Sequence, residues 1–241
     1  MPFRLKRSVA EVYGTETWLT DKFPALEIMY GKVVRSLLGV RQSTPLDLCL
    51  IEAGMQPIKD LIMQRRNSFL AKKIPTLSEE DPLSIALELT RHIQSVQLRQ
   101  FRACMDYTPV PLEDRIRDLS EYKTRYHTYL DINPELTQHR VYHGYTRDSL
   151  RIAYTRFILS SHRLRIETGR WTRPTTLREN RLCDCGLFIQ DERHVVSFCD
   201  RTRAVRERYS LHHGQSLNDI LRDSDTGVLC HFIKDIMDAF D

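Results

Sequence analysis

The feature that most constrains this chain is a cluster of cysteines around one histidine near its C-terminal end. Three of the six cysteines fall within seventeen residues, in the pattern C-x1-C-x8-H-x4-C. Zinc takes four nitrogen or sulfur ligands at tetrahedral positions, and three thiolates with one imidazole suit Zn²⁺ better than harder cations. The pattern therefore predicts a structural Zn²⁺ site with no open position. The candidate ligands are Cys183, Cys185, His194 and Cys199.

The residues between these ligands indicate how the four side chains can meet. Gly186 permits a tight turn after the first two thiolates. Asp191 and Glu192 can begin a short helix that presents the histidine and the last cysteine. One residue between the first two cysteines is a tighter spacing than the usual two, so a small core with free thiols is the alternative.

The N-terminal sequence and the overall composition bear on where such a protein resides. Apolar residues make up 41% and charged residues 28%, which fits a soluble globular chain. The first residues lack the apolar segment of a secretory signal, and no apolar run is long enough to span a bilayer. We therefore expect an intracellular protein, nuclear or cytoplasmic, whose clustered cysteines bind metal rather than form disulfides. Three isolated cysteines lie among apolar residues and are expected to be buried: Cys49, Cys104 and Cys230.

Helical periodicity runs through most of the chain, and no series alternates as a strand would. The clearest apolar stripe covers residues 24–39, and Gly39 is placed to end that helix. Further helices are expected over residues 44–54, 57–75, 82–105, 112–130, 146–158 and 229–240. The predicted fold class is mainly α, with one small zinc-organised element near the C-terminal end. The stripe consists of Leu26, Met29, Tyr30, Val33, Val34, Leu37 and Leu38.

Local signals refine this expectation at particular residues. Thr44 is a good N-cap for the second helix, and Arg66 is expected on the solvent side of the third. Tyr122, Tyr126 and Tyr129 are helically spaced and are expected in the core.

A polar stretch over residues 75–82 indicates a boundary. We expect a helical region over residues 1–75, connecting helices over 76–140, and an arginine-rich helix, zinc element and terminal helix over 141–241.

Charge is concentrated in the segment that holds the predicted metal ligands. Residues 147–208 contain fourteen arginines, eight acidic residues and no lysine. An arginine-only segment beside a metal site suggests contact with phosphate, whereas a solvated helix surface is the alternative. Trp171 or Tyr154 could stack a nucleic-acid base, although we expect both in the core. The candidate nucleic-acid-binding residues are Arg156, Arg163, Arg165, Arg170 and Arg173.

Four segments, in one order along the chain, resemble LINE-type (non-LTR) retrotransposon reverse transcriptases. Residues 13–18 (YGTETW) resemble the YG-x-E-x-W segment that follows the palm, and residues 37–47 (LLGVRQSTPLD) resemble LLGVR-x-STP-x-D. Residues 52–58 (EAGMQPI) resemble E-x-G-x-x-P. Residues 155–171 resemble the TR-x-R-x-x-SH-x-L-x-IE-x-GRW segment that precedes the family's C-terminal CCHC zinc knuckle. The four candidate metal ligands match that knuckle residue by residue.

The resemblance implies a thumb-like region after the palm, followed by a region that grips RNA, DNA or both beside the polymerase. The family's polymerase holds catalytic metal with paired aspartates in a Y/F-x-D-D turn, and this sequence contains no such turn. We therefore expect a non-catalytic region, from a truncated copy or a gene model that covers only the 3′ end. Its expected partner is nucleic acid, and neither a membrane nor a small-molecule substrate is expected. The alternative is a degenerate or domesticated helical protein-interaction module with a purely structural zinc site.

Overall fold

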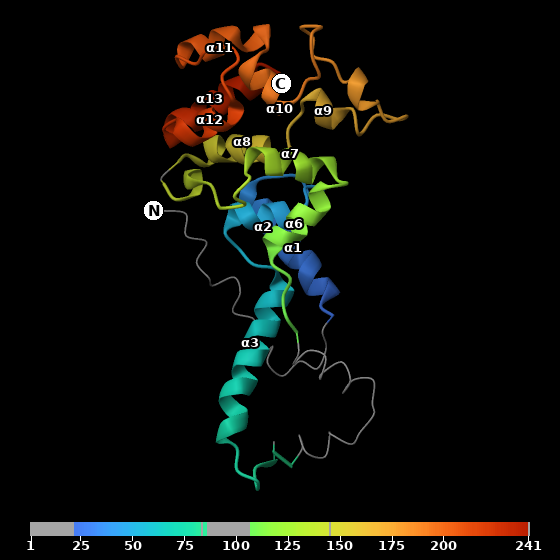
Figure 1. Ribbon diagram of the computed structural model, residues 1–241, viewed down its shortest axis with the longest axis vertical. Helices are drawn as coiled ribbons and strands as arrows, with labels where there is room; N and C mark the ends of the chain where they lie inside the picture. Colours follow the sequence, from blue (N-terminus) through green and yellow to red (C-terminus); the bar gives the residue numbers. More distant parts are fainter. Residues whose placement is uncertain (1–21, 83, 86–106, 145, 241) are drawn as a thin grey trace. The chain divides into compact units, whose positions relative to one another are not determined.

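The computed structural model describes residues 22–82, 84–85, 107–144 and 146–240 (Figure 1). Within these ranges the chain is helical, and its β pairing is limited to one isolated bridge between Leu182 and Ile189. The predicted mainly α class is therefore confirmed. The YGTETW segment, Cys104 and nearly all of the helix expected over 82–105 lie outside the described residues. None of the helices within the described ranges is long and apolar enough to cross a bilayer.

The helices have the following bounds. The α-helices are α1 (Pro24–Leu38), α2 (Leu46–Ala53), α3 (Ile58–Lys73), α6 (Leu112–Ser120), α7 (Thr124–Ile132), α8 (Asp148–Ile158), α9 (Arg165–Thr168), α10 (Glu192–Ser197), α11 (Arg203–Arg208), α12 (Leu217–Asp223) and α13 (Thr226–Asp238). Short 3-10 helices are η3 (Ile74–Thr76), η4 (Arg140–Tyr142), η5 (Arg178–Asn180) and η6 (Asp200–Thr202).

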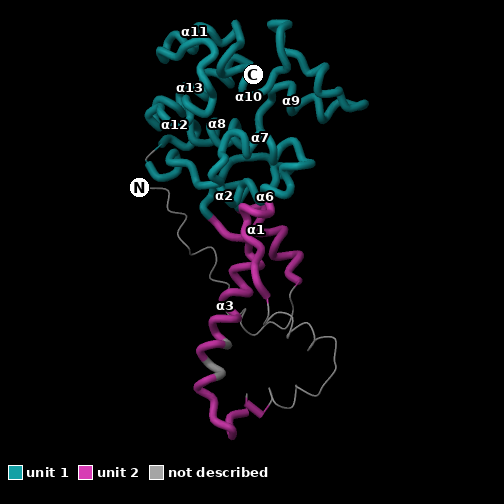
Figure 2. Tube along the Cα trace, in the orientation of Figure 1, with its two compact units in different colours: residues 1–4, 34–54, 116–241 teal, residues 5–33, 55–115 magenta. Residues whose placement is uncertain are grey.

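The chain divides into two compact units, drawn in different colours in Figure 2. The first contains residues 34–54 and the described residues from 116 onward. The second contains residues 22–33 and the described residues of 55–115. All candidate metal ligands and all candidate nucleic-acid-binding arginines lie in the first unit. The boundaries expected near residues 75 and 140 remain predictions.

The core of the first unit is built where α8 packs against α13. The predicted apolar faces supply it, and these side chains are 2% exposed or less: Tyr154, Phe157, Ile158, Phe232, Ile233 and Ile236. Helix α13 begins three residues before the predicted start because Asp225 caps it. Its carboxylate accepts hydrogen bonds from the backbone N–H groups of Gly227 and Val228, at 2.8 and 3.2 Å.

The first two helices end where the sequence predicts, but α2 begins differently. Gly39 follows α1 with φ +69°, and a β-carbon there would lie 2.8 Å from the Ile152 side chain. Gly54 ends α2 in the left-handed conformation. Thr44 is not the N-cap of α2, because Pro45 takes that position without a side-chain cap. Thr44 is instead buried, and its carbonyl accepts a hydrogen bond from Arg35 Nε at 2.7 Å.

The single helix predicted over residues 112–130 is two helices, α6 and α7, separated by a turn. At the end of α6 the Ser120 hydroxyl donates to the Arg117 carbonyl at 2.6 Å, and Lys123 has an extended backbone. The break leaves Tyr122 65% exposed, so its predicted core position is wrong. Tyr126 and Tyr129, on α7, are buried as predicted.

Two further side chains differ from the predicted faces of their helices. Met29 is 57% exposed because the buried line of α1 runs through Tyr30, Val34 and Leu38, with Met29 at its edge. Arg66 was expected in solvent but is fully buried on α3, with Nη1 3.7 Å from Met63 Sδ. A guanidinium that is removed from water in this way requires polar or charged partners, and Arg66 takes part in such interactions. The isolated Cys49 and Cys230 are buried as predicted.

Candidate metal centre

The first two candidate ligands lie on a tight hairpin. Leu182 and Ile189 form its antiparallel bridge, and Cys183 N–H donates to the Phe188 carbonyl at 2.8 Å. At the tip, Gly186 N–H donates to the Cys183 carbonyl at 2.8 Å, and Gly186 has φ +76°. A side chain would strain this backbone, which is why glycine serves the turn as predicted.

The other two ligands come from α10 and the residues just after it. Asp191 caps this helix, since its carboxylate accepts the backbone N–H of His194 at 2.9 Å. His194 therefore lies in the first turn, and Cys199 follows the end of the helix. The expected short helix is present and carries His194, whereas Cys199 lies two residues beyond its end, at the N-cap of η6.

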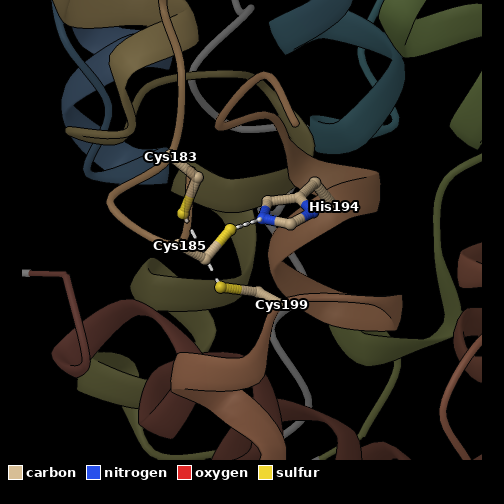
Figure 3. A group of neighbouring side chains, drawn as sticks. All are labelled: Cys183, Cys185, His194 and Cys199. Carbon is tan, nitrogen blue, oxygen red and sulfur yellow. Dashed lines mark hydrogen bonds between the residues drawn. The ribbon is translucent and has the colours of Figure 1, made fainter. Parts of the chain in front are cut away.

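Hairpin and helix bring all four candidate ligands together (Figure 3). Their ligand atoms lie within 4.8 Å of one another, with Cys183 Sγ 3.6 Å from Cys199 Sγ and Cys185 Sγ 3.2 Å from His194 Nε2. Bond lengths of about 2.0–2.3 Å to zinc would place tetrahedral ligand atoms roughly 3.3–3.8 Å apart. The cluster can therefore hold a metal ion, and its donors and spacing are compatible with zinc.

The pKa values of two thiols in the cluster, Cys183 and Cys199, are shifted in opposite directions. Burial raises the pKa of Cys183, but hydrogen bonds from the Cys185 backbone and the Gln190 amide outweigh it and hold that pKa below its usual value. Burial, together with the neighbouring Cys183, raises the pKa of Cys199 to about 12. Neighbouring thiolates repel one another, and a bound cation removes this repulsion. A metal cation at this position would stabilise the deprotonated, ligating form of the thiols.

Gln190 joins the hairpin to the preceding arginine-rich segment. Its amide donates to Cys183 Sγ at 3.6 Å, and its side-chain oxygen accepts Arg165 N–H at 2.8 Å. Its backbone carbonyl accepts Ile166 N–H at 3.1 Å. The sequence did not identify this residue, because a glutamine between two ligands carries no spacing signal of its own.

A buried polar network joins α10 to the end of α8. Glu192, the first residue of α10, accepts hydrogen bonds from Ser160 Oγ at 2.7 Å and from His162 Nε2 at 2.8 Å. Burial raises the pKa of Glu192, but His162 and the two hydrogen bonds outweigh it, so that the net pKa is lowered. Ser161, between these partners, accepts the backbone N–H of Arg41 at 3.0 Å. The network therefore fixes α10, which carries His194, to residues 160–162.

Ser161 and His162 also line a groove of about 550 Å³. Two of the five candidate arginines, Arg156 and Arg163, lie in this groove. Arg41 and Lys234 join them from distant parts of the sequence, and neither was predicted as a site residue. Arg41 belongs to the LLGVR stretch, but its place in the groove depends on tertiary packing that no local pattern reveals. We call this feature the basic groove.

The remaining three candidate arginines are placed elsewhere. Arg165 forms an ion pair with Asp184 and donates to the Leu182 carbonyl at 2.8 Å, so it braces the hairpin that carries Cys183 and Cys185. Arg170 pairs with the buried Glu167 at 3.2 Å. Arg173 is exposed. Arg163 therefore lies apart from Arg165 and Arg170, because nearby carboxylates hold the latter two.

The two aromatic residues that could stack a base differ in burial. Tyr154 is 1% exposed, in agreement with the expected core position. Trp171 is 47% exposed, so its expected core position is wrong. The Arg41 guanidinium lies 4.0 Å above its ring centre, and this cation–π contact covers one face of the indole.

Comparisons with known proteins identify no relative of this chain. No protein-family model, no curated protein and no solved structure matches it.

Proposed function

We propose that this chain is a non-catalytic, nucleic-acid-binding region that corresponds to the part after the palm in LINE-type reverse transcriptases. The proposal is supported by the order of the family-like segments, by the Cys₃His cluster and by the absence of a paired-aspartate turn from the sequence. The observation that carries it is the basic groove, where Arg156 and Arg163 face a common space. Arginine offers planar, charged donors that suit the phosphates of RNA or DNA.

In this proposal the cluster holds a structural Zn²⁺. Cys183, Cys185, His194 and Cys199 supply all four positions of a tetrahedral site, so the ion binds no substrate. It joins the hairpin to α10, and Glu192 joins α10 to the residues beside the basic groove. Zinc thus contributes to nucleic-acid binding only by holding the arginine-bearing segment in place.

The Arg156→Gln/Arg163→Gln double variant is expected to bind single-stranded RNA and duplex DNA roughly ten-fold or more weakly than the wild type. Each charge-assisted hydrogen bond that the substitutions remove is worth about 1.5–3 kcal/mol. The slope of log affinity against log salt concentration should also become shallower, by roughly 0.7–0.9 for each phosphate that the variant no longer neutralises. Fluorescence anisotropy at several salt concentrations measures both quantities.

The matched control is the Arg178→Gln/Arg222→Gln variant, which removes the same charge from exposed residues outside the basic groove. Its affinity should stay within about two-fold of the wild type, because distant charges are screened at moderate salt. Equal weakening in the two double variants would show that net charge, and not the groove, is responsible.

A second function, a protein-interaction module, is favoured by an apolar patch on the metal-binding element. Leu187 and Phe188 at the hairpin and Phe198 beside Cys199 are exposed, and the two phenylalanine rings lie 6.4 Å apart. Exposed apolar groups of this size are found at protein interfaces. Under this alternative the chain would bind nucleic acid weakly or not at all, and substitutions in the basic groove would have no effect on its binding.

A further inference from the structure

We propose that the basic groove contains a defined binding site for one phosphate group, with Arg41 as its central residue and Arg156 and Arg163 at its sides. The site rests on the proposed function in one respect, namely that a nucleic-acid backbone is the expected source of the phosphate. It goes beyond that function in assigning a discrete, saturable site to a residue outside the arginine-rich segment.

Arg41 is held in place but has a donor without an acceptor. Its backbone N–H donates to Ser161 Oγ, and its guanidinium lies 4.0 Å above the Trp171 ring. Its Nη1 is buried and has no hydrogen-bond partner within the described part of the chain. A buried donor without an acceptor is unfavourable, so an oxyanion that reaches Nη1 would be bound favourably.

The two side arginines are also available to an anion. Arg156 donates from Nε to the Gly39 carbonyl at 2.7 Å. This hydrogen bond orients the guanidinium and leaves its two terminal nitrogens available to an anion. Arg163 is exposed and makes no hydrogen bond or ion pair with any residue that the structure describes. Among the described residues lining the groove, Asp238 is the one carboxylate, and it is paired with Lys234.

The charge around Arg41 is consistent with an anion site. Burial lowers the pKa of Arg41 most, and Arg125, Arg163 and Arg156 lower it further by like-charge repulsion. Glu167 acts in the opposite direction, but this carboxylate is itself bound by Arg125, with Nε at 2.9 Å, and by Arg170. An anion between Arg41, Arg156 and Arg163 would relieve the repulsion among them.

Phosphate is the anion that best fits these donors. Its tetrahedral oxygens can accept from several guanidinium groups at once, and arginine forks bind them in pairs. A carboxylate offers two oxygens in one plane and would satisfy fewer of the donors. The groove volume of about 550 Å³ exceeds what a lone phosphate needs, so an attached chain could enter with it.

The first test is a titration of the full chain with inorganic phosphate at constant ionic strength, with chloride as the balancing anion. Two-dimensional ¹H–¹⁵N NMR should show saturable shifts at Arg41, Ser161 and Arg163. Arg41→Gln and Arg163→Gln should each weaken phosphate binding roughly ten-fold, because each removes one charge-assisted hydrogen-bond donor group. Arg178→Gln, a change of equal charge at an exposed residue outside the groove, should stay within about two-fold of the wild type.

Because Arg163 is exposed, its variant keeps the test valid even if Arg41→Gln disturbs the fold. Linear, unsaturable shifts spread over all arginines would overturn the site, and so would equal affinities in all three variants. A second arm repeats the comparison with labelled single-stranded RNA. If RNA binds normally but phosphate does not saturate, the site is wrong and the proposed function stands. If phosphate saturates but RNA does not bind at low salt, the site stands and the proposed function is wrong.

Discussion

Cys183→Ser is expected to abolish metal binding and to unfold the segment near residues 175–205. Structural zinc contributes on the order of 10 kcal/mol to the folding of small metal-organised elements. The segment has little regular secondary structure of its own, because its hairpin has a single β bridge and α10 is only six residues long. Elemental analysis should find one zinc ion per wild-type chain and none in the variant. Hydrogen exchange should show that protection is lost around α10, while α2 and α3 stay protected.

The control for this prediction is Cys230→Ser, which alters an equally buried thiol outside the cluster. This variant places a hydroxyl in the core, which lowers stability, but it should retain its zinc ion. Wild-type protein purified without chelator, with its thiols reduced and no metal bound, would refute the site. Retention of the metal by Cys183→Ser would refute the assigned ligand set.

Glu52→Gln is expected to remove a large pH dependence from the stability of the first unit. Glu52 lies on α2, fully buried, and accepts a hydrogen bond from Tyr129 OH at 2.6 Å. Burial raises its pKa from 4.5 to about 7, although hydrogen bonds from Tyr129, Tyr142 and Asn133 act in the opposite direction. The carboxyl is therefore protonated in the folded protein over a range where the unfolded chain is ionised.

The direction of the effect follows from proton binding. Between pH 4.5 and about 7 the folded state binds more protons at Glu52 than the unfolded state does. The free energy of unfolding therefore falls as pH rises through this range, by about 3 kcal/mol in total. Above the folded pKa the full penalty remains, so glutamine, which stays neutral, should make the protein more stable than the wild type at high pH.

Urea unfolding of wild type and Glu52→Gln between about pH 5.5 and pH 8 measures this effect and keeps the metal site out of strong acid. The stability difference between the two proteins should change by about 2 kcal/mol over that interval, in favour of the variant at the higher pH. Glu135→Gln makes the same change at an exposed residue, and its stability should depend on pH as that of the wild type does. A stability difference for Glu52→Gln that does not vary with pH would show that Glu52 is not neutral in the folded protein.

Local chemistry made part of the architecture predictable from the sequence. The periodic stripe identified α1, and Gly39 and Gly54 ended their helices where a left-handed residue was expected. The metal cluster was predictable because its ligands lie within seventeen residues and the cap at Asp191 is a local signal. Each of these features depends on residues close together in the chain.

Features that depend on tertiary packing were not predictable in this way. Arg41 and Lys234 join Arg156 in the basic groove although more than seventy residues separate each of them from it. Arg165 and Arg170 were grouped with Arg163 by sequence distance, but Asp184 and Glu167 hold them elsewhere. The number of arginines in a segment shows where charge is concentrated along the sequence. The fold determines which of these arginines are paired with carboxylates and which line the basic groove.

The most direct test of nucleic-acid binding is a salt series with the zinc-loaded wild-type chain. Labelled single-stranded RNA and duplex DNA are titrated at increasing salt concentration, and log affinity is plotted against log salt. We predict binding at low salt with little sequence preference and a slope of roughly −0.7 to −0.9 for each phosphate that the protein neutralises. Failure of the folded, zinc-loaded chain to bind either nucleic acid at low salt would contradict the proposed function.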